Sequence, residues 1–169
     1  MQIQLHNQES LGENQMSDLS WIAGFFEGEG SIGIHKRNDK RRKKCWYVLS
    51  VRVCNTQREL LLPFLMFGGT IKLMKRPRPK DIYQWAIVSK QAKTFLETIE
   101  LFIKSNIWRK KINLAIDFQN QKRITGYFDK KYFKIQTEFY NKMIKLNKIT
   151  HTVATDLDPK AEDFQQILD

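Results

Sequence analysis

The sequence predicts an α+β domain in which helices cover one face of a four-stranded antiparallel sheet. Two observations predict this class. A helical pattern is followed by two strand–turn–strand segments with a short helical pattern between them, and three further helical patterns come after the second segment. Strands that are grouped in hairpins, rather than alternating singly with helices, are typical of α+β domains. The 169 residues suit one domain, and 41% hydrophobic residues are enough for a packed core.

The chain is expected to open with a flexible leader and then a buried helix. Residues 1–16 are polar and aperiodic and are interpreted as the leader. A helix over 17–29 follows, with Ser17 as its N-cap and Asp18 in its first turn. Gly28 and Gly30 end this helix. Its apolar residues fall on nearly every side, which predicts burial all round: Leu19, Trp21, Ile22, Ala23, Phe25 and Phe26.

Four segments have the composition and alternation of strands, and they pair into two hairpins: Ser31–Arg37 with Trp46–Cys54, and Thr70–Arg76 with Ile82–Val88. A basic turn over 38–44 joins the first pair, and a turn over 77–80 joins the second. Between the hairpins, Thr56 is expected to cap a short helix over 57–67 that Gly68 and Gly69 end.

Helical patterns at 89–104, 107–122 and 132–147 complete a domain that is expected to span 17–150. Residues 151–169 form an acidic C-terminal tail. Asp158 and Pro159 suit a helix start, and apolar residues follow at helical spacing, so the tail is expected to contain a short docking helix. A free tail is the alternative.

The charge of the chain indicates a polyanionic partner. Lys and Arg total 29 against 18 Asp and Glu, which gives a net charge of +11 and a pI near 9.7. Nucleic acid is the first candidate and an anionic membrane surface the second. Two cysteines and three scattered histidines exclude a disulfide scaffold and a zinc cluster. Reduced thiols favour an intracellular location, in an organelle (chloroplast or mitochondrion) or a bacterial cytoplasm.

The positive charge gathers at the two hairpins. Seven basic residues and one acid lie between Lys36 and Lys44, and a second cluster lies between Lys72 and Lys80. Basic residues at hairpin tips also protect sheet edges from aggregation. That alternative does not explain why both hairpins are basic while the helices are more balanced. A ribbon of antiparallel strands can enter the major groove of duplex DNA, so we expect the sheet to bind DNA.

Two carboxylates lie at the C-terminal end of the first helix, where the helix dipole disfavours them. These are Glu27 and Glu29. Carboxylates and unpaired carbonyl oxygens are good ligands for Mg²⁺ or Ca²⁺, so a divalent cation would offset the unfavourable placement. The alternative is that both are solvated surface acids beyond a frayed helix end.

Gly24 and Gly28 lie four residues apart in the same helix, and each costs about 1 kcal/mol there relative to Ala. Together they leave a smooth backbone face on which another helix can pack closely. Since the chain has one such helix, the partner is expected to be the same helix of a second subunit in a two-fold dimer. The alternative is an internal helix or strand that fills the groove.

The stretch over 22–30 resembles the LAGLIDADG motif: Ala23 and Gly24 match it, Glu27 and Glu29 stand for its two acids, and Gly28 and Gly30 flank the second acid. The order of elements from residue 17 to about residue 120 is also similar. The chain therefore resembles the LAGLIDADG homing endonucleases, and its single motif resembles their homodimeric branch.

The resemblance implies an αββαββα fold with a curved DNA-binding sheet and additional C-terminal helices. It implies a homodimer with one active site in each subunit, bound to a long pseudo-palindromic duplex. The two sites hydrolyse opposite strands across the minor groove with Mg²⁺ or another divalent metal and leave short 3′ overhangs. Such an enzyme would be intron-encoded, so a reading frame inside a group I intron would support the interpretation.

The resemblance also implies roles for single residues. Glu29 is the metal-binding catalytic carboxylate, helped by the backbone carbonyl of Gly28, and Glu27 serves the helix end or the dimer interface. Both acids are Glu rather than the commoner Asp, so the longer side chain must still reach the metal. The expected interface residues are Trp21, Gly24, Phe25 and Gly28.

Two further catalytic positions follow from the same resemblance. A polar residue near the end of the second strand supports the attacking water, and Asn55 falls there. A basic residue near the start of a later helix supports the scissile phosphate. The match is poorer at that point: Lys110 is the first choice and Lys104 the alternative.

Strand alternation predicts which side chains face DNA. The inward set is Ile32, Ile34, Tyr47, Leu49, Val51, Val53, Ile71 and Leu73. Arg52 suits a bidentate contact to guanine or a phosphate contact or surface ion pair, and His35 a contact to a base or to the backbone. Phosphate anchors and base readers together are Ser31, Gly33, His35, Arg37, Arg41, Arg42, Lys43, Lys44, Trp46, Val48, Ser50, Arg52, Lys72, Met74, Arg76, Lys80 and Gln84.

Two other functions fit the same sequence. The first is a non-cleaving nucleic-acid binder on the same fold, either an RNA maturase that assists intron folding or a decayed endonuclease. The second is a basic RNA-binding protein outside this family, which requires the motif match to be accidental. A metal-dependent cleavage assay on duplex DNA separates the endonuclease from both.

Overall fold

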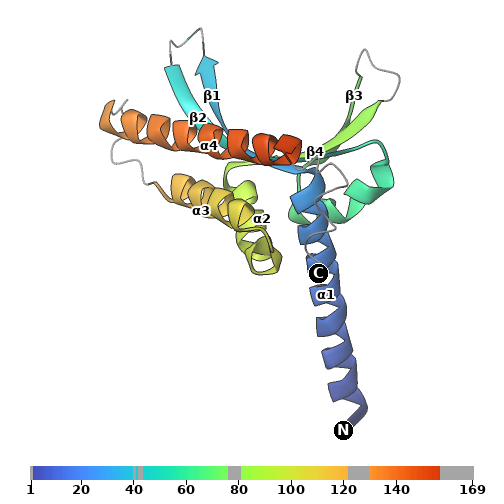
Figure 1. The fold of residues 1–169 in the computed structure, drawn as a ribbon. Coiled ribbons are helices and arrows are strands. Elements are labelled where there is room, and N and C mark those ends of the chain that lie inside the picture. The colour runs from blue at the N-terminus through green and yellow to red at the C-terminus, as the bar shows by residue number, and fades with distance from the viewer. Residues whose placement is uncertain (1, 40, 42–43, 76–80, 122–129, 157–169) are drawn as a thin grey trace, which may run out of the picture.

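The computed structural model describes residues 2–39, 41, 44–75, 81–121 and 130–156. It has the α+β class and the αββαββα order that the sequence predicts, followed by a 3-10 turn and two more α-helices (Figure 1). The elements in chain order are α1 (Gln2–Glu29), β1 (Gly30–Asp39), β2 (Lys44–Asn55), the 3-10 helix η1 (Arg58–Phe67), β3 (Thr70–Met74), β4 (Ile82–Val88), α2 (Ser89–Ile99), the 3-10 turn η2 (Glu100–Phe102), α3 (Asn106–Asn120) and α4 (Lys130–Asp156).

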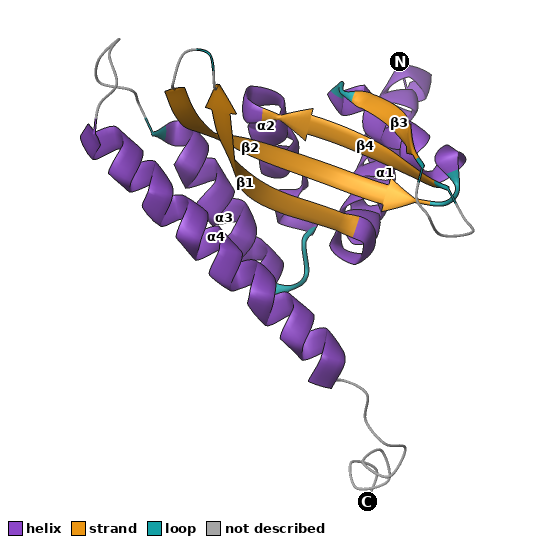
Figure 2. Cartoon of the chain, turned by 90° about the horizontal axis from the view of Figure 1, so that it is seen from above, coloured by secondary structure: helices purple, strands orange, loops and turns teal. Residues whose placement is uncertain are grey.

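The four strands form one antiparallel sheet in the order β1-β2-β4-β3. The two hairpins therefore meet through β2 and β4. In Figure 1 the hairpins rise on either side of the sheet's middle, which makes the sheet curved. We call the face that carries Ile32, Val51 and Ile87 the inner face, because it packs on the helices. The opposite, outer face lies open when the sheet is seen from above, and none of the described helices crosses it there (Figure 2).

The core lies between the inner face and the helices. The alternation predicted for β2 is confirmed, since Tyr47, Leu49, Val51 and Val53 are all buried. An aromatic cluster continues the core toward α1 and α2, where the Phe95 ring lies 5.1 Å from the Phe26 ring and 5.3 Å from the Trp85 ring. Burial of such side chains contributes roughly 1.5–3 kcal/mol each. The helices thus fix the sheet from one side only.

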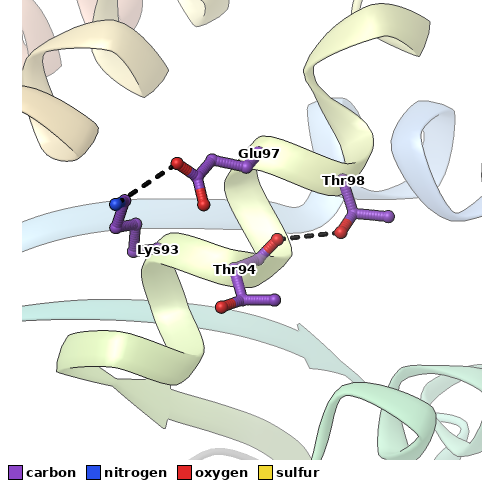
Figure 3. Close-up of polar contacts among 4 residues, drawn as sticks. All are labelled: Lys93, Thr94, Glu97 and Thr98. Atoms are coloured by element: carbon purple, nitrogen blue, oxygen red, sulfur yellow. Dashed lines mark hydrogen bonds and ion pairs between the residues drawn. The ribbon is translucent and has the colours of Figure 1, made fainter.

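Polar contacts stabilise α2 internally and join α4 to the sheet. On α2, the Lys93 ammonium lies 3.4 Å from the Glu97 carboxylate, and the Thr98 hydroxyl donates to the Thr94 carbonyl at 2.8 Å (Figure 3). Exposed pairs of this kind contribute only about 0.3–0.5 kcal/mol. α4 is tied to the sheet by the Asn147 amide, which donates to the Ile32 carbonyl oxygen at 3.1 Å.

The first helix differs from the prediction at its start and in its burial. α1 begins at Gln2, so Ser17 lies inside the helix and is not its N-cap, and residues 2–16 are helical rather than a loose leader. Their Gln, Leu and Glu residues favour a helix, and no proline stops it. The helix is also not buried all round, because Trp21 is 43% exposed.

The later boundaries shift in smaller ways. The segment predicted as one helix over 89–104 is α2 followed by η2. η1 is a 3-10 helix that contains Pro63, which lacks the N–H that an α-helix needs. Its N-cap position is Gln57 rather than Thr56. Leu73, predicted to point into the core, is 45% exposed because β3 is an edge strand that the helices do not cover. None of the described helices is long and apolar enough to cross a membrane.

α4 is longer than the predicted helix over 132–147, and it continues into the segment assigned to the tail, as far as Asp156. The predicted docking helix after Asp158 lies outside the described residues.

Candidate catalytic and DNA-binding surface

Glu29 lies at a sharp corner, as the last residue of α1 and directly before β1. The next residue, Gly30, must lack a side chain, because a Cβ there would lie 2.3 Å from Cδ2 of Phe26 and 2.4 Å from the Phe26 carbonyl oxygen. The helix therefore turns into the strand without a loop, and the Glu29 side chain is exposed at this corner. An acid is thus held next to the end of the sheet.

Glu27 is bound within the chain. Its carboxylate accepts hydrogen bonds from the backbone N–H of Ser105 at 2.8 Å and of Lys104 at 3.2 Å. Both N–H groups lie just before α3, where negative charge is favourable. Glu27 therefore joins α1 to the start of α3, and it is not a solvated acid beyond a frayed helix end.

The carboxylates of Glu27 and Glu29 differ in their capacity to bind a metal ion. Among the described residues there is no group of three or more His, Cys, Asp or Glu side chains that would hold a metal ion. Glu27 already accepts two N–H groups, whereas Glu29 has an exposed carboxylate. Mg²⁺ commonly binds one or two carboxylates together with waters and substrate phosphates. The donor set at this corner fits a divalent cation that is completed by DNA phosphate.

Asn55 is placed at the same end of the sheet as Glu29, because Gly30 pairs with Val53 two residues before it. The Asn55 Oδ1 accepts the Gln57 N–H at 2.9 Å, which fixes the amide group. Lys104 lies beside the corner through its backbone bond to Glu27, and its side chain is exposed.

Lys110 is exposed on α3, and the neighbouring Lys111 is the buried lysine, 4% exposed. Its Nζ lies 4.9 Å from the centre of the Trp108 ring, and that ring packs 5.0 Å from Phe26 of α1. Burial lowers the pKa of Lys111 below its ordinary value. Lys111 is not among the predicted site residues, although its spacing from Trp108, Ile112 and Ala115 places it on the buried side of α3.

The strand register brings most of the predicted DNA-facing residues onto the outer face. Ser31, Arg52, Ala86 and Thr70 form one row across all four strands. The predicted residues on this face are Ser31, Gly33, His35, Arg37, Trp46, Val48, Ser50, Arg52, Lys72, Met74 and Gln84. The register adds five that were not selected, namely Cys54, Thr70, Ile82, Ala86 and Val88.

The remaining predicted DNA contacts belong to the two hairpin turns. Arg41 is exposed in the first turn, and Lys44 begins β2. The others lie outside the described residues: Arg42, Lys43, Arg76 and Lys80. One expectation on the face itself was wrong, because Ser50 is only 3% exposed and is covered by its neighbours.

A hydrogen bond joins two outer-face residues on neighbouring strands. Arg52 Nη2 lies 3.3 Å from His35 Nε2. Arginine can only donate, so Nε2 is the acceptor and the imidazole is neutral, with its proton on Nδ1. Burial is the main cause that lowers the pKa of His35 from its ordinary value of 6.5, and the positive charges of Arg52 and Arg37 lower it further.

The residues predicted for the dimer interface share one side of α1. Trp21, Gly24 and Gly28 are exposed, and Phe25 is partly buried, with its ring 5.1 Å from Trp21 and 5.9 Å from Phe64. A Cβ added to Gly24 or Gly28 would meet no described atom within 4 Å. Within the described part of the chain, no helix or strand fills this groove, so the internal alternative does not hold there.

Comparison with known proteins agrees with this geometry. Among solved structures, the homing endonuclease I-CvuI in complex with the I-CreI target aligns at TM-score 0.65 and 21% identity, over 79% of this chain and 83% of that one. The archaeal intron-encoded homing endonuclease I-Vdi141I complexed with DNA aligns at 0.64 and 16%, over 78% and 85%. The homing endonuclease I-TnaI aligns at 0.57 and 14%, over 80% and 97%. At these identities the likeness concerns the fold.

No curated protein matches the chain by sequence. A family model described as LAGLIDADG endonuclease, however, matches residues 22–124, which is more than half of the chain. The match begins in the motif helix and takes in both hairpins, α2 and α3. The chain therefore belongs to the LAGLIDADG endonuclease family, as its single motif indicates.

Proposed function

We propose that this protein is a site-specific homing endonuclease that binds a long pseudo-palindromic DNA duplex as a homodimer. It hydrolyses both strands across the minor groove with a divalent metal and leaves short 3′ overhangs. The observation that carries the proposal is the corner at Glu29. It holds an exposed carboxylate at the end of a sheet whose open face carries Arg37, Arg52 and Lys72.

The outer face supports DNA binding by its shape and charge. It is curved, and no described helix covers it (Figure 2). The chain's net charge of +11 would supply the phosphate contacts, and the strands would supply the base contacts. The arrangement suits a β-ribbon in the major groove on each side of the cleavage position.

The exposed side of α1 supports the homodimer. Gly24 and Gly28 leave a smooth surface beside the exposed Trp21 ring, and packing of two such helices would bring the two Glu29 corners close together. Each subunit would then serve one strand. A two-fold dimer predicts a pseudo-palindromic site of about 20 base pairs.

At each corner, Glu29 and the carbonyl oxygen of Gly28 would hold the metal, with Mg²⁺ as the expected ion. A bound divalent cation polarises the phosphate, supplies a nucleophilic water at neutral pH and stabilises the leaving oxygen. Two related solved structures of I-CvuI bound to DNA were determined in the presence of Mg, with the DNA not cleaved, and of Ca, which supports the use of a divalent metal. Asn55 orients the attacking water, and Lys104 or Lys110 neutralises the scissile phosphate.

The test is cleavage of duplex DNA by the purified chain. If the gene lies in a group I intron, the joined flanking exons provide the substrate; otherwise a randomised duplex library does. A double-strand break that requires Mg²⁺ and stops with a chelator is expected. Specific binding without cleavage would instead indicate the non-cleaving binder, either a maturase or a decayed endonuclease.

Sedimentation of the protein–DNA complex tests the dimer separately. Two chains per duplex are expected, and Gly28→Trp should reduce this to one. Asn113→Trp, on an exposed position of α3, is the matched control and should leave two. A single wild-type chain on the duplex would contradict the homodimer.

A further inference from the structure

Four outer-face residues of β1 and β2 form one cluster, which we call the Arg52 cluster: Gly33, His35, Ser50 and Arg52. The register places Gly33 opposite Ser50 and His35 opposite Val48, whereas Arg52 lies opposite Ser31. His35 and Arg52 are therefore not direct cross-strand partners. Their side chains reach across the intervening Gly33–Ser50 pair to make the 3.3 Å hydrogen bond.

Gly33 provides the space for this bridge. A Cβ at position 33 would lie 2.6 Å from His35 Nε2 and 3.0 Å from His35 Cε1. The imidazole thus lies across the bare backbone of Gly33, with its Nε2 turned toward Arg52. Any larger residue at this position would displace the ring.

Ser50 is the small residue next to this position on β2. Its hydroxyl is the buried side-chain polar group that has no hydrogen-bond partner among the described residues. Because Ser50 pairs with Gly33, two small residues lie side by side under the bridge. The bridge is therefore packed against the sheet rather than extended freely into solvent.

The hydrogen bond occupies only part of the guanidinium. Arg52 has five N–H donors in a planar fork, and His35 accepts one of them. Enough donors remain for the bidentate contact that arginine makes with O6 and N7 of guanine. An arginine whose fork is fixed before binding loses less conformational freedom when it makes that contact.

We propose that His35 and Arg52 act as one reading unit, in which His35 is a positioning residue that aims Arg52 at a guanine in the major groove of each half-site. The inference rests on the proposed DNA-binding function. It adds that guanine is the base that is read and that His35 fixes the arginine that reads it. It also accounts for Gly33 as the residue that makes room for the positioning side chain.

The test is selection of bound duplexes from a randomised library, followed by sequencing, with the wild-type chain and single variants. Wild type should select guanine at one position in each half-site. Arg52→Ala should reduce that preference roughly 5- to 150-fold, the range for a bidentate pair. His35→Phe and Gly33→Ala should weaken it at the same position and no other, although both keep the arginine. His35→Gln, whose Oε1 can still accept from Arg52, should restore most of it.

The free protein offers a second measurement. Nitrogen NMR of His35 should show the Nδ1–H tautomer, and Arg52→Ala should raise the pKa of His35 because one neighbouring positive charge is gone. Lys145→Ala, an exposed cation on α4, is the control and should change neither the base preference nor this pKa. An Nε2–H tautomer would overturn the pairing.

The outcomes separate the two proposals. If wild type selects a target but His35→Phe and Arg52→Ala change different positions, the reading unit is wrong and the endonuclease proposal stands. The same conclusion follows if Arg52→Ala weakens binding to all sequences equally. If wild type binds no duplex DNA at all, the proposed function itself fails.

Discussion

The end of α1 and the outer face of the sheet carry opposite charges, and they hold them differently. At the end of α1, one carboxylate is fixed by two backbone N–H groups and the other is exposed. On the outer face, Arg52 is held by His35, whereas Arg37 and Lys72 are exposed. At the end of α1 the fixed side chain belongs to the structure and the exposed one is the proposed metal ligand, whereas on the outer face the fixed Arg52 is itself the proposed base reader and the exposed cations are the proposed phosphate contacts.

We therefore expect that a substitution at the end of α1 can abolish cleavage while DNA binding is retained. Glu29→Gln keeps the shape of the side chain and removes the charge that would hold the metal. Cleavage in Mg²⁺ should fall by orders of magnitude, because the metal supplies both the nucleophile and the charge stabilisation. A gel shift should show that DNA binding survives. Full cleavage by this variant would refute the catalytic role, and loss of binding together with cleavage would assign Glu29 to the fold or the dimer.

On the outer face, a substitution is expected to change DNA binding and to leave cleavage intact. Lys72→Gln removes one exposed cation in each subunit, so the slope of log affinity against log salt should decrease by about 1 per subunit. Cleavage at saturating DNA should stay near wild type. Lys145→Gln on α4 is the matched control and should leave the slope unchanged. An unaltered slope for Lys72→Gln would show that β3 does not contact phosphate.

Glu27 should behave as a residue that fixes the structure. Glu27→Gln retains one acceptor oxygen and loses one of the two hydrogen bonds to the start of α3, so the free energy of unfolding should fall by about 1 kcal/mol. Cleavage should fall much less than in Glu29→Gln. Chemical denaturation of both variants checks this. A larger loss of stability in Glu29→Gln than in Glu27→Gln would reverse the assignment.

The smallest effect concerns the pH dependence of stability. The pKa of His35 is below 6.5 in the folded chain and near 6.5 when unfolded, so His35 is neutral in both states well above pH 6.5. As the pH falls below 6.5, the unfolded chain binds a proton that the folded chain does not, and stability decreases until the folded pKa is reached. Compared with His35→Gln, wild type should lose more stability between pH 7 and 5. Parallel curves would contradict the lowered pKa.

The sequence predicted much of the fold because apolar residues decide which side of a strand is buried. The faces of β1 and β2 followed from Ile32, Ile34 and Leu49, and the bounds of β4 were right. The predicted burial of Leu73 was wrong because burial on an edge strand depends on whether a helix covers that strand. The prediction for the start of α1 was wrong because residues 2–16 include good helix formers but show no periodic apolar pattern.

The site was predictable only in part, because its key contacts join distant segments. Glu27 and Ser105 lie 78 residues apart, and no local pattern links them. The His35–Arg52 bond depends on the strand register, which alternation alone does not fix. The position of Glu29, by contrast, followed from the motif itself, where Gly28 and Gly30 mark the end of the helix.

We expect the active site built on Glu29 in each subunit to cleave one strand. The direct measurement uses a heterodimer of one wild-type chain and one Glu29→Gln chain, purified by two different tags, on a duplex labelled on both strands. The heterodimer should nick one strand and leave the other intact, while the wild-type homodimer should break both. Cleavage of both strands by the heterodimer, or of neither, would contradict it.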